Sequence, residues 1–298
     1  MSIHATIYGD HFGIRGKPFS LLPDPDFIFW SKNHRRAYSM LEYGLVSFAP
    51  IIVITGEVGA GKTTLIQHLL RSAPCEFDIG MIANAHGRRG ALLHWVLTAF
   101  GQAVGERVAY VRLFSQFQEF LAARAERGHR CVLIVDEAQN LSMPMLEELR
   151  CFSNLNGADS ERLQIVLVGQ PELRETIDRP KLLQFAQRVA ADFHLAGMSR
   201  DAVHDYITHR LGVVGARREI FTPAACDKIY EASGGLPRVI NQICDYALVN
   251  AFADDVGVVD DDLIEQVAAD RGLRWHPGQK TGPLLSIASR AEARAKRS

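Results

Sequence analysis

The chain has 298 residues, of which 47% are hydrophobic and 22% charged, and its formal net charge is −1. These values are typical of a folded chain with one large core or a main domain plus a smaller one, and they exclude a strong overall attraction to nucleic acid or membrane. The five cysteines are an odd number without a C-x-x-C pair, so the sequence predicts buried thiols and excludes a disulfide framework or a zinc site.

The first residues, MSIHATIYGD, lack the basic and then apolar layout of a signal peptide. The longest apolar run, around residues 49–55, is far too short to span a bilayer. We therefore expect a cytoplasmic location, with peripheral association at the inner membrane as the alternative.

A stretch rich in proline and aromatic residues, FGIRGKPFSLLPDPDFIFW, occupies residues 12–30. Its prolines fix φ and favour extended turns over regular structure. A helix is expected after it, over residues 33–45 (NHRRAYSMLEYGL). On its own the stretch is a stiffened aromatic loop, and its role depends on the rest of the chain.

Apolar runs of strand length recur further along the chain, at residues 51–55, 77–83, 131–135, 164–168 and 189–195. Stretches with helical periodicity lie between them, such as ALLHWVLTAFG and LFSQFQEFLAARAERG. This alternation predicts an α/β fold in which a parallel five-stranded sheet is sandwiched by helices.

From Ser199 onward only helical patterns remain, beginning with SRDAVHDYITHRLG, and the last residues are basic. The sequence therefore predicts an all-helical lid after the sheet domain. The predicted division is an N-terminal strap and helix packing on the ligand site over 1–46, a sheet core over 47–198, the lid over 199–272 and a flexible basic tail over 273–298.

The strand at 51–55 runs directly into GEVGAGKTT, which fits the phosphate-loop pattern G-x-x-x-x-G-K-[ST]. The glycines let the backbone curl so that its N–H groups point at a β-phosphate, and the helix beginning near Lys62 adds its positive dipole end. Lys62 supplies a mobile positive charge, and Thr63 would hold Mg²⁺. A chance glycine-rich turn is the alternative, which the preceding strand and the following helix disfavour. The residues predicted to bind the nucleotide are Gly56, Glu57, Val58, Gly59, Ala60, Gly61, Lys62, Thr63 and Thr64.

The segment CVLIVDEAQN delivers Asp136 and Glu137 at the carboxyl end of an apolar strand, where ligands bind in parallel α/β sheets. Asp136 would fix Mg²⁺, directly or through its water. Glu137 would orient and deprotonate the water that attacks the γ-phosphate. An acidic turn at a strand end is the alternative, but together with the phosphate loop the motif predicts an ATP hydrolase.

Three further polar residues lie where such a site needs them: Gln170, Arg188 and Arg238. Gln170 ends a strand that we expect beside the acidic strand, and it could hold the attacking water or sense the γ-phosphate. Arg188 lies where a helix gives way to the last strand, from which it can reach a neighbouring subunit. Arg238 opens a lid helix and could bend back onto the nucleotide. A surface arginine or a helix cap is the alternative for the two arginines. The histidines lack a metal-site spacing, so His34 is expected to be an ordinary surface or core imidazole.

The order of these motifs resembles the AAA+ superfamily, in the branch of the general secretion pathway protein A (ExeA-like) ATPases. The resemblance runs from about residue 12 to residue 270 and includes Phe-Gly, Pro-Phe, Pro-Asp-Pro, an aromatic pair and a Ser-x-x-His step, then GEVGAGKTTL, LIVDEAQNL, LEELRCFSNL, VGQPELRE and GGLPRVIN. The sequence is also similar to the ATPases encoded with exosortase and exopolysaccharide systems.

The resemblance implies an AAA+ ATPase that binds ATP or ADP and Mg²⁺ and assembles into a homo-oligomer. It implies that Lys62 and Thr63 contact phosphates and metal, and that Asp136 and Glu137 contact metal and water. The remaining roles implied are first sensor for Gln170, finger acting in trans for Arg188 and second sensor for Arg238. With this context, we predict that residues 12–30 form a strap across the nucleotide site that packs Phe27, Phe29 or Trp30 near the adenine.

Secretion members of this family typically continue into a membrane helix and a periplasmic domain, whereas this sequence stops at residue 298. We therefore expect a cytoplasmic ATPase that drives assembly or regulation of an envelope secretion, sorting or exopolysaccharide system, with inner-membrane or envelope components as partners. The alternative is a DNA-associated AAA+ ATPase that regulates transposition target selection, with the basic tail on DNA. A third alternative, a nucleotide switch that barely hydrolyses, is disfavoured by the presence of Glu137.

Overall fold

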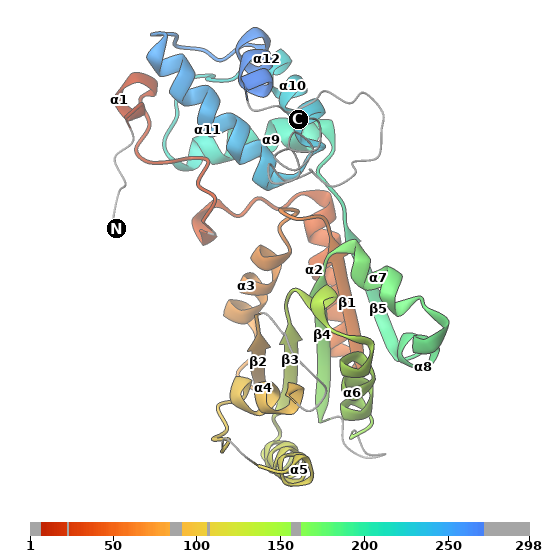
Figure 1. Cartoon of the computed structure of the whole chain (residues 1–298). Coiled ribbons are helices and arrows are strands. Elements are labelled where there is room, and N and C mark those ends of the chain that lie inside the picture. The colour runs from red at the N-terminus through yellow and green to blue at the C-terminus, as the bar shows by residue number, and fades with distance from the viewer. Residues whose placement is uncertain (1–6, 23, 84–90, 106–107, 156–161, 271–298) are drawn as a thin grey trace, which may run out of the picture.

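A computed structural model describes residues 7–22, 24–83, 91–105, 108–155 and 162–270. They form a sheet domain and a helical lid that lies beyond one end of its strands (Figure 1). The lid side is the end at which the strands finish, so any group at a carboxyl strand end faces the lid.

The sheet is parallel and has five strands, as predicted, in the order β2-β3-β4-β1-β5. The strands are β1 (Ile51–Gly56), β2 (Phe77–Ile82), β3 (Arg130–Val135), β4 (Leu163–Gly169) and β5 (Val189–Leu195). The strand that ends in the acidic motif, β3, is separated from the phosphate-loop strand, β1, by β4 alone. The ends of these three strands therefore bring their polar residues to one place.

The core has two parts because successive side chains of a strand point to opposite faces of the sheet. Ile51 and Val53 join one buried cluster, while Ile52 and Ile54 join the other. Helices α2 (Lys32–Val46) and α3 (Lys62–Ser72) cover the second face. The first face is covered by α4 (Leu92–Ala99), α5 (Tyr110–Glu126), α6 (Met143–Ser153), α7 (Pro171–Ile177) and α8 (Leu183–Ala186).

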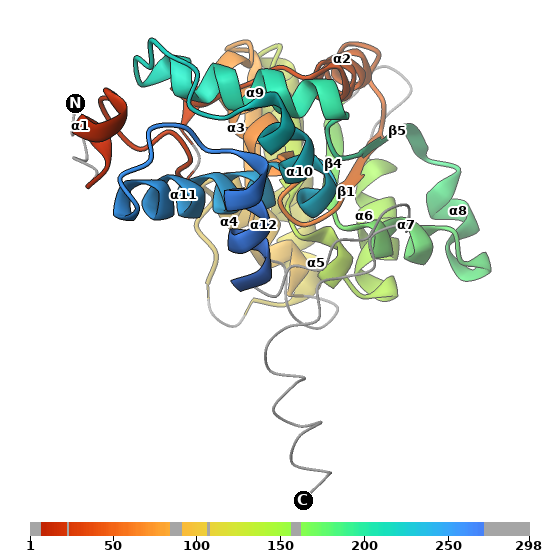
Figure 2. The ribbon, with the colours of Figure 1, turned by 90° about the horizontal axis from the view of Figure 1, so that it is seen from above.

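The lid consists of α9 (Arg200–Val213), α10 (Pro223–Ser233), α11 (Pro237–Ala253) and α12 (Asp261–Asp270). Helix α10 begins with proline at its first position, and the Thr222 hydroxyl accepts the Ala225 N–H at 3.1 Å. Seen from above, the lid helices lie across the sheet domain (Figure 2). The lid therefore covers the carboxyl end of the sheet.

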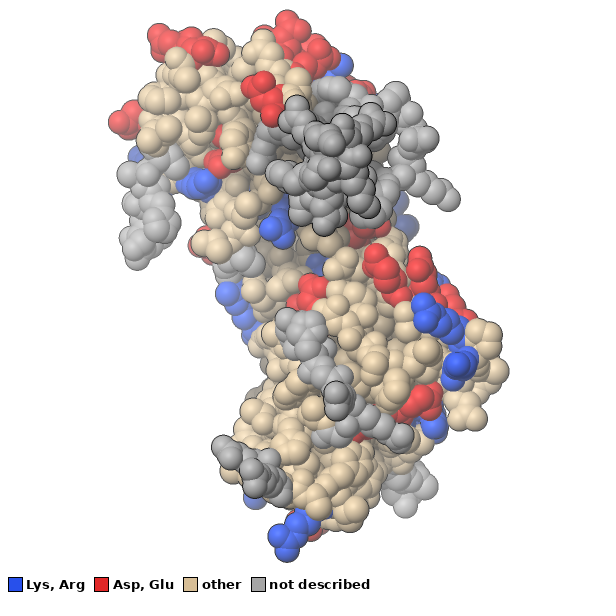
Figure 3. All heavy atoms as spheres, in the orientation of Figure 1, with Lys and Arg blue, Asp and Glu red and all other residues tan. Residues whose placement is uncertain are grey.

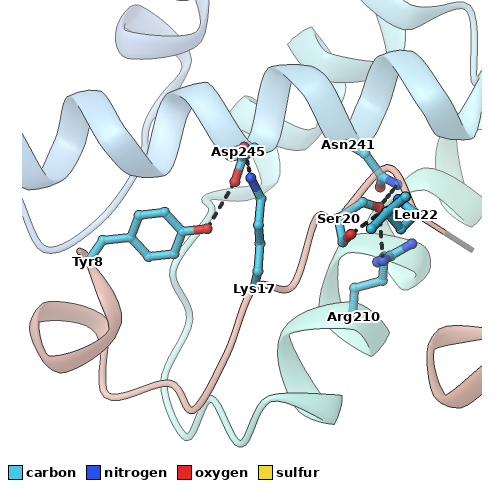
Figure 4. Close-up of polar contacts among 7 residues, drawn as sticks. All are labelled: Tyr8, Lys17, Ser20, Leu22, Arg210, Asn241 and Asp245. Carbon is cyan, nitrogen blue, oxygen red and sulfur yellow. Dashed lines mark hydrogen bonds and ion pairs between the residues drawn. The ribbon is translucent and has the colours of Figure 1, made fainter. Parts of the chain in front are cut away.

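The beginning of the chain packs on the lid. Helix α1 (Gly9–Phe12) and the residues around it bury Tyr8, Phe12 and Phe19 in the same apolar cluster as the lid helices. The Tyr8 hydroxyl donates to Asp245 of α11 at 2.9 Å, and Lys17 pairs with the same carboxylate at 2.7 Å (Figure 4). Within the described residues the predicted N-terminal unit is thus divided: residues 7–19 join the lid, whereas α2 joins the sheet domain.

A buried polar network fixes the chain where it leaves the lid core (Figure 4). Arg210 of α9 donates to the Pro18 carbonyl at 2.5 Å and to the Tyr206 hydroxyl at 2.8 Å. Asn241 of α11 accepts from the same hydroxyl at 2.8 Å and donates to the Ser20 carbonyl at 3.2 Å. Since buried polar groups are costly without partners, this network holds the chain at Pro18 and Ser20 against the lid.

Three cysteines are buried, namely Cys131, Cys226 and Cys244, but Cys75 and Cys151 are exposed. The prediction of buried thiols is therefore wrong for these two. Cys75 lies in the loop between α3 and β2, and Cys151 lies on the solvent side of the amphipathic helix α6. Among the described residues, no helix combines the length and apolar character needed to cross a membrane.

Candidate nucleotide-binding site

A cavity of about 370 Å³ lies where the phosphate loop, the N-terminal strap and the lid meet. Its volume is in the range of pockets that hold small molecules and cofactors. Phe29 from the strap, Lys62 from the loop, Glu137 and Gln170 from the strand ends and Arg238 from the lid all line it. The sequence predicts that four of these five residues share one site, and it offers Phe29 as one of three strap aromatics near the adenine.

The phosphate loop has the backbone that its glycines predict. Gly59 and Gly61 have φ values of 83° and 100°, a region that side chains disfavour. A Cβ on Gly59 would overlap the Cβ of Arg238, and one on Gly61 would lie 2.6 Å from Nε2 of His34. The loop therefore needs glycine both for its conformation and for close packing, and it leads into the amino end of α3, which is suited to bind an anion.

Lys62 is held inside the loop and is only 8% exposed. Its ammonium group donates to the carbonyls of Gly56, at 2.6 Å, and Glu57, at 3.1 Å. Burial lowers the pKa of Lys62, and the nearby carboxylates of Glu137 and Asp136 oppose that shift. Phosphate oxygens would be stronger partners for this cation than the two neutral carbonyls that it contacts here.

A histidine that sequence reasoning treated as ordinary supports the loop. His34 is buried, and its Nε2 donates to the Ala60 carbonyl at 3.1 Å. In the neutral ring a donating Nε2 leaves Nδ1 as the acceptor, and the Ser31 hydroxyl lies 2.8 Å from it. Burial lowers the pKa of His34, which favours this neutral form. The Ser-x-x-His spacing was visible in the sequence, but its partner in the phosphate loop was not.

The acidic strand end provides a buried carboxylate, Asp136, and the first turn of α3 provides an exposed hydroxyl, Thr63. Asp136 is 7% exposed, and its Oδ1 accepts the Glu137 N–H at 2.9 Å. Burial raises the pKa of Asp136, so a cation beside it would stabilise its charged form. Thr63, in the first turn of α3, lines the cavity. A hydroxyl and a carboxylate are hard oxygen donors of the kind that Mg²⁺ prefers, so these residues fit that ion.

Glu137 and Gln170 meet at the neighbouring ends of β3 and β4. The side-chain amide of Gln170 donates to Oε2 of Glu137 at 3.3 Å. Glu137 has a φ of 52°, a conformation that is uncommon for residues other than glycine and that recurs at active sites. The structure therefore brings the predicted water-activating residue and the predicted sensor together.

Gln139 lies in the same cluster and was missed as a site residue. Its amide Nε2 donates to Oε2 of Glu137 at 2.5 Å, and its Oε1 accepts the Gln170 N–H at 3.0 Å. The residue stands in the DEAQN segment, two positions after Glu137. Only the placement of β4 beside β3 shows that it bridges two strand ends.

The two predicted arginines lie in different surroundings. Arg238 opens α11 and lines the cavity, and its N–H donates to the Gly59 carbonyl at 3.3 Å. Arg188 is exposed and directly precedes β5, beside the amino end of β1, so it lies at the end of the sheet away from the phosphate loop. Its reach to a neighbouring subunit stays a prediction.

The aromatic residues of the strap line the cavity, as the sequence suggested. Phe29 packs edge-on against Tyr206 of the lid, with ring centroids 5.7 Å apart, and the Arg210 guanidinium lies 4.7 Å from the ring of Phe27. Trp30 packs instead on the sheet side, 4.8 Å from His68 of α3. The strap thus joins lid and sheet domain along one wall, while its contact with an adenine stays a prediction.

Comparison with known proteins agrees with this architecture. Residues 47–177 match the model of a family described as AAA domain. General secretion pathway protein A of Aeromonas hydrophila is 40% identical over 283 residues, which are 95% of this chain and 52% of that protein. This chain thus spans about half the length of that relative. The predicted resemblance to general secretion pathway protein A and to AAA domains is confirmed.

Solved structures share the fold at much lower identity. The origin recognition complex of Drosophila bound to DNA matches with a TM-score of 0.67 and 17% identity, over 92% of this chain and 68% of that one. Cdc6p of Pyrobaculum aerophilum matches with a TM-score of 0.67 and 14% identity, over 88% of this chain and 72% of that one. ORC2 of Aeropyrum pernix, in ADPNP and ADP complexes, matches with a TM-score of 0.59 and 16% identity, over 85% of this chain and 71% of that one. These likenesses confirm the predicted P-loop α/β fold.

Proposed function

The chain is an AAA-domain protein related to general secretion pathway protein A, and from this premise we propose that it binds ATP with Mg²⁺ and hydrolyses it. The observation that carries the proposal is the meeting of Lys62, Glu137 and Gln170 around one cavity. A phosphate-binding cation and a carboxylate at a nearby strand end are the groups that hydrolysis of a phosphoanhydride needs.

The proposed chemistry follows from where these groups lie. Lys62 and the N–H groups of the loop bind the β- and γ-phosphates, and Arg238 approaches them from the lid. Glu137 takes the proton of the attacking water, while Gln170 orients that water. Thr63 and Asp136 would hold Mg²⁺, which when bound neutralises charge on the phosphate oxygens.

Purified protein is expected to release phosphate from ATP in the presence of Mg²⁺ and to stop when EDTA removes the metal. The reason is that Thr63 and Asp136 present hard oxygen donors next to the phosphate loop. Phosphate release should be measured by a coupled assay, and excess Mg²⁺ should restore it after EDTA. Equal rates with and without EDTA would contradict the proposed metal site.

We further propose that the protein acts as a homo-oligomer in which Arg188 reaches the nucleotide of the adjacent subunit. Support comes from its position: the side chain is exposed and lies outside the residues that line its own cavity. A planar, permanently charged guanidinium suits a role on phosphate oxygens.

Mixing two inactive variants is expected to restore activity if Arg188 acts in trans. A Glu137→Gln subunit keeps its Arg188, and an Arg188→Ala subunit keeps its Glu137, so about a quarter of the interfaces in a random mixture combine both intact groups. ATP turnover of the mixture should therefore exceed that of either variant alone. A mixture that is no more active than its components would show that Arg188 acts on its own subunit or not at all.

For the cellular role, we propose a cytoplasmic ATPase, with peripheral association at the inner membrane as the alternative, that serves assembly or regulation of an envelope secretion, sorting or exopolysaccharide system. The 40% identity to general secretion pathway protein A supports this role. The alternative function is a DNA-associated ATPase that regulates transposition target selection. Its support is the basic tail, residues 273–298, which lies outside the described residues. Figure 3 shows acidic side chains at the lid end of the visible face. Three exposed acidic residues of the lid are Asp254, Asp255 and Asp260. Tight binding to duplex DNA that weakens steeply with salt would instead favour the alternative.

A further inference from the structure

The side-chain amide of Gln139 connects Glu137 and Gln170, the residues that activate and orient the attacking water in the proposed reaction. One end donates to Oε2 of Glu137 at 2.5 Å, and the other end accepts the Gln170 N–H at 3.0 Å. The orientation of the amide follows from these partners, because a carboxylate only accepts and a backbone N–H only donates. A second donor, the side-chain amide of Gln170, reaches the same oxygen of Glu137 at 3.3 Å.

The surroundings leave this amide little freedom. Gln139 lies in the 3-10 turn η2 (Ala138–Asn140), which directly follows Glu137. A Cβ on Gly169, the last residue of β4, would lie 2.9 Å from Oε1 of Gln139 and 3.2 Å from its backbone nitrogen. Glycine at the end of β4 therefore lets the turn pack directly on the strand and places the Gln139 side chain between the two strand ends.

We propose that Gln139 is a positioning residue of the ATPase, which fixes the carboxylate of Glu137 relative to Gln170. With both amides on Oε2, Oε1 is the oxygen directed to the water. Glu137 alone could turn about its side-chain bonds, and such misalignment slows proton transfer. This inference rests on the proposed function, because it assigns Gln139 an effect only through Glu137.

Two substitutions distinguish two roles of Gln139. In one it positions the carboxylate of Glu137, and in the other it only holds η2 against the end of β4. Gln139→Leu removes both hydrogen bonds while nearly keeping the side-chain volume. Gln139→Glu keeps an oxygen that can accept the Gln170 N–H, but it replaces the donor to Glu137 with an acceptor and adds a like charge. A structural tie is therefore preserved in Gln139→Glu, whereas the positioning contact is lost in both variants.

Both variants are expected to lower kcat for ATP by about 10- to 100-fold, as loss of one hydrogen bond to a charged group predicts. ATP affinity should stay within about twofold of wild type, because the phosphate contacts of Lys62 are unchanged. Gln118→Leu and Gln118→Glu, at an exposed position of α5, are the matched controls and should leave kcat unchanged. Wild-type kcat in Gln139→Glu, or parallel losses of kcat and affinity, would overturn the proposal.

The effect must also depend on Glu137. In a Glu137→Gln background, adding Gln139→Leu should leave the residual rate unchanged, since the group that Gln139 positions is no longer a base. A further loss of 10-fold or so in that background would show an independent role and would overturn the inference. If the wild-type protein hydrolyses no ATP, the proposed function fails; if it hydrolyses ATP and the Gln139 variants keep its rate while Glu137→Gln does not, this inference alone fails.

Discussion

Replacing Lys62 with alanine is expected to weaken ATP binding by about 10- to 150-fold, the equivalent of roughly 1.5–3 kcal/mol for lost hydrogen bonds to a charged partner. The ammonium group is buried and points back at the carbonyls of its own loop, so it already lies where the phosphates would bind. Titration of the purified protein with a fluorescent ATP analogue would measure the change.

The control for Lys62→Ala is a variant that removes a lysine outside the phosphate loop. Lys181→Ala is suitable, because Lys181 is exposed on the short turn η3 (Pro180–Leu182). It should bind ATP with wild-type affinity. If Lys62→Ala also binds ATP as tightly as the wild type does, the assignment of the phosphate loop is wrong.

Replacing Glu137 with glutamine should abolish most turnover and leave binding intact. The amide keeps the size of the side chain but cannot take a proton from water, and loss of general-base catalysis costs about 10²- to 10⁴-fold in rate. Because Glu137 lies at the end of β3 and the phosphate cation comes from α3, the affinity for ATP should change little. Steady-state phosphate release and nucleotide titration on one preparation would separate the two effects.

Glu119→Gln provides the same chemical change at an exposed position of α5 and should hydrolyse ATP at the wild-type rate. Turnover by Glu137→Gln within a few-fold of wild type would mean that another group activates the water. Loss of ATP binding in Glu137→Gln would instead indicate that the substitution disturbs the loop.

Much of the sheet domain was predictable because its signals are local. Buried parallel strands appear in the sequence as continuous apolar runs, and β5 (Val189–Leu195) has the predicted bounds. The phosphate loop requires glycine at positions of positive φ, such as Gly59 and Gly61, so its conformation is encoded in a short segment. Parallel topology then brings the ends of β1, β3 and β4 to one edge.

The course of the first residues was not predictable in the same way. Their attachment to the lid depends on pairs far apart in the chain, such as Tyr8 with Asp245 (Figure 4) and Arg210 with Pro18. The residues next to a tyrosine or an arginine in the sequence do not indicate which distant residue it contacts. The proline- and aromatic-rich composition indicated a strap but not which domain holds it.

The supporting residues of the site escaped prediction for a related reason. His34 contacts the carbonyl of Ala60, and Gln139 contacts the N–H of Gln170, so each has a backbone group as a partner. Backbone groups are present at every residue, so the residue types in a sequence do not identify which of them will be a partner. Residues that meet the ligand follow motifs, whereas residues that position them depend on which strands become neighbours.

The central claim is that one cavity both binds ATP and hydrolyses it through Glu137. The most direct measurement is a single-turnover assay, in which ATP labelled at the γ-phosphate is bound first without metal and Mg²⁺ is then added with excess unlabelled ATP. The wild-type protein is expected to convert the bound ATP to ADP and phosphate, while Glu137→Gln holds the same amount of ATP uncleaved. Equal cleavage by both proteins, or no bound ATP in either, would contradict it.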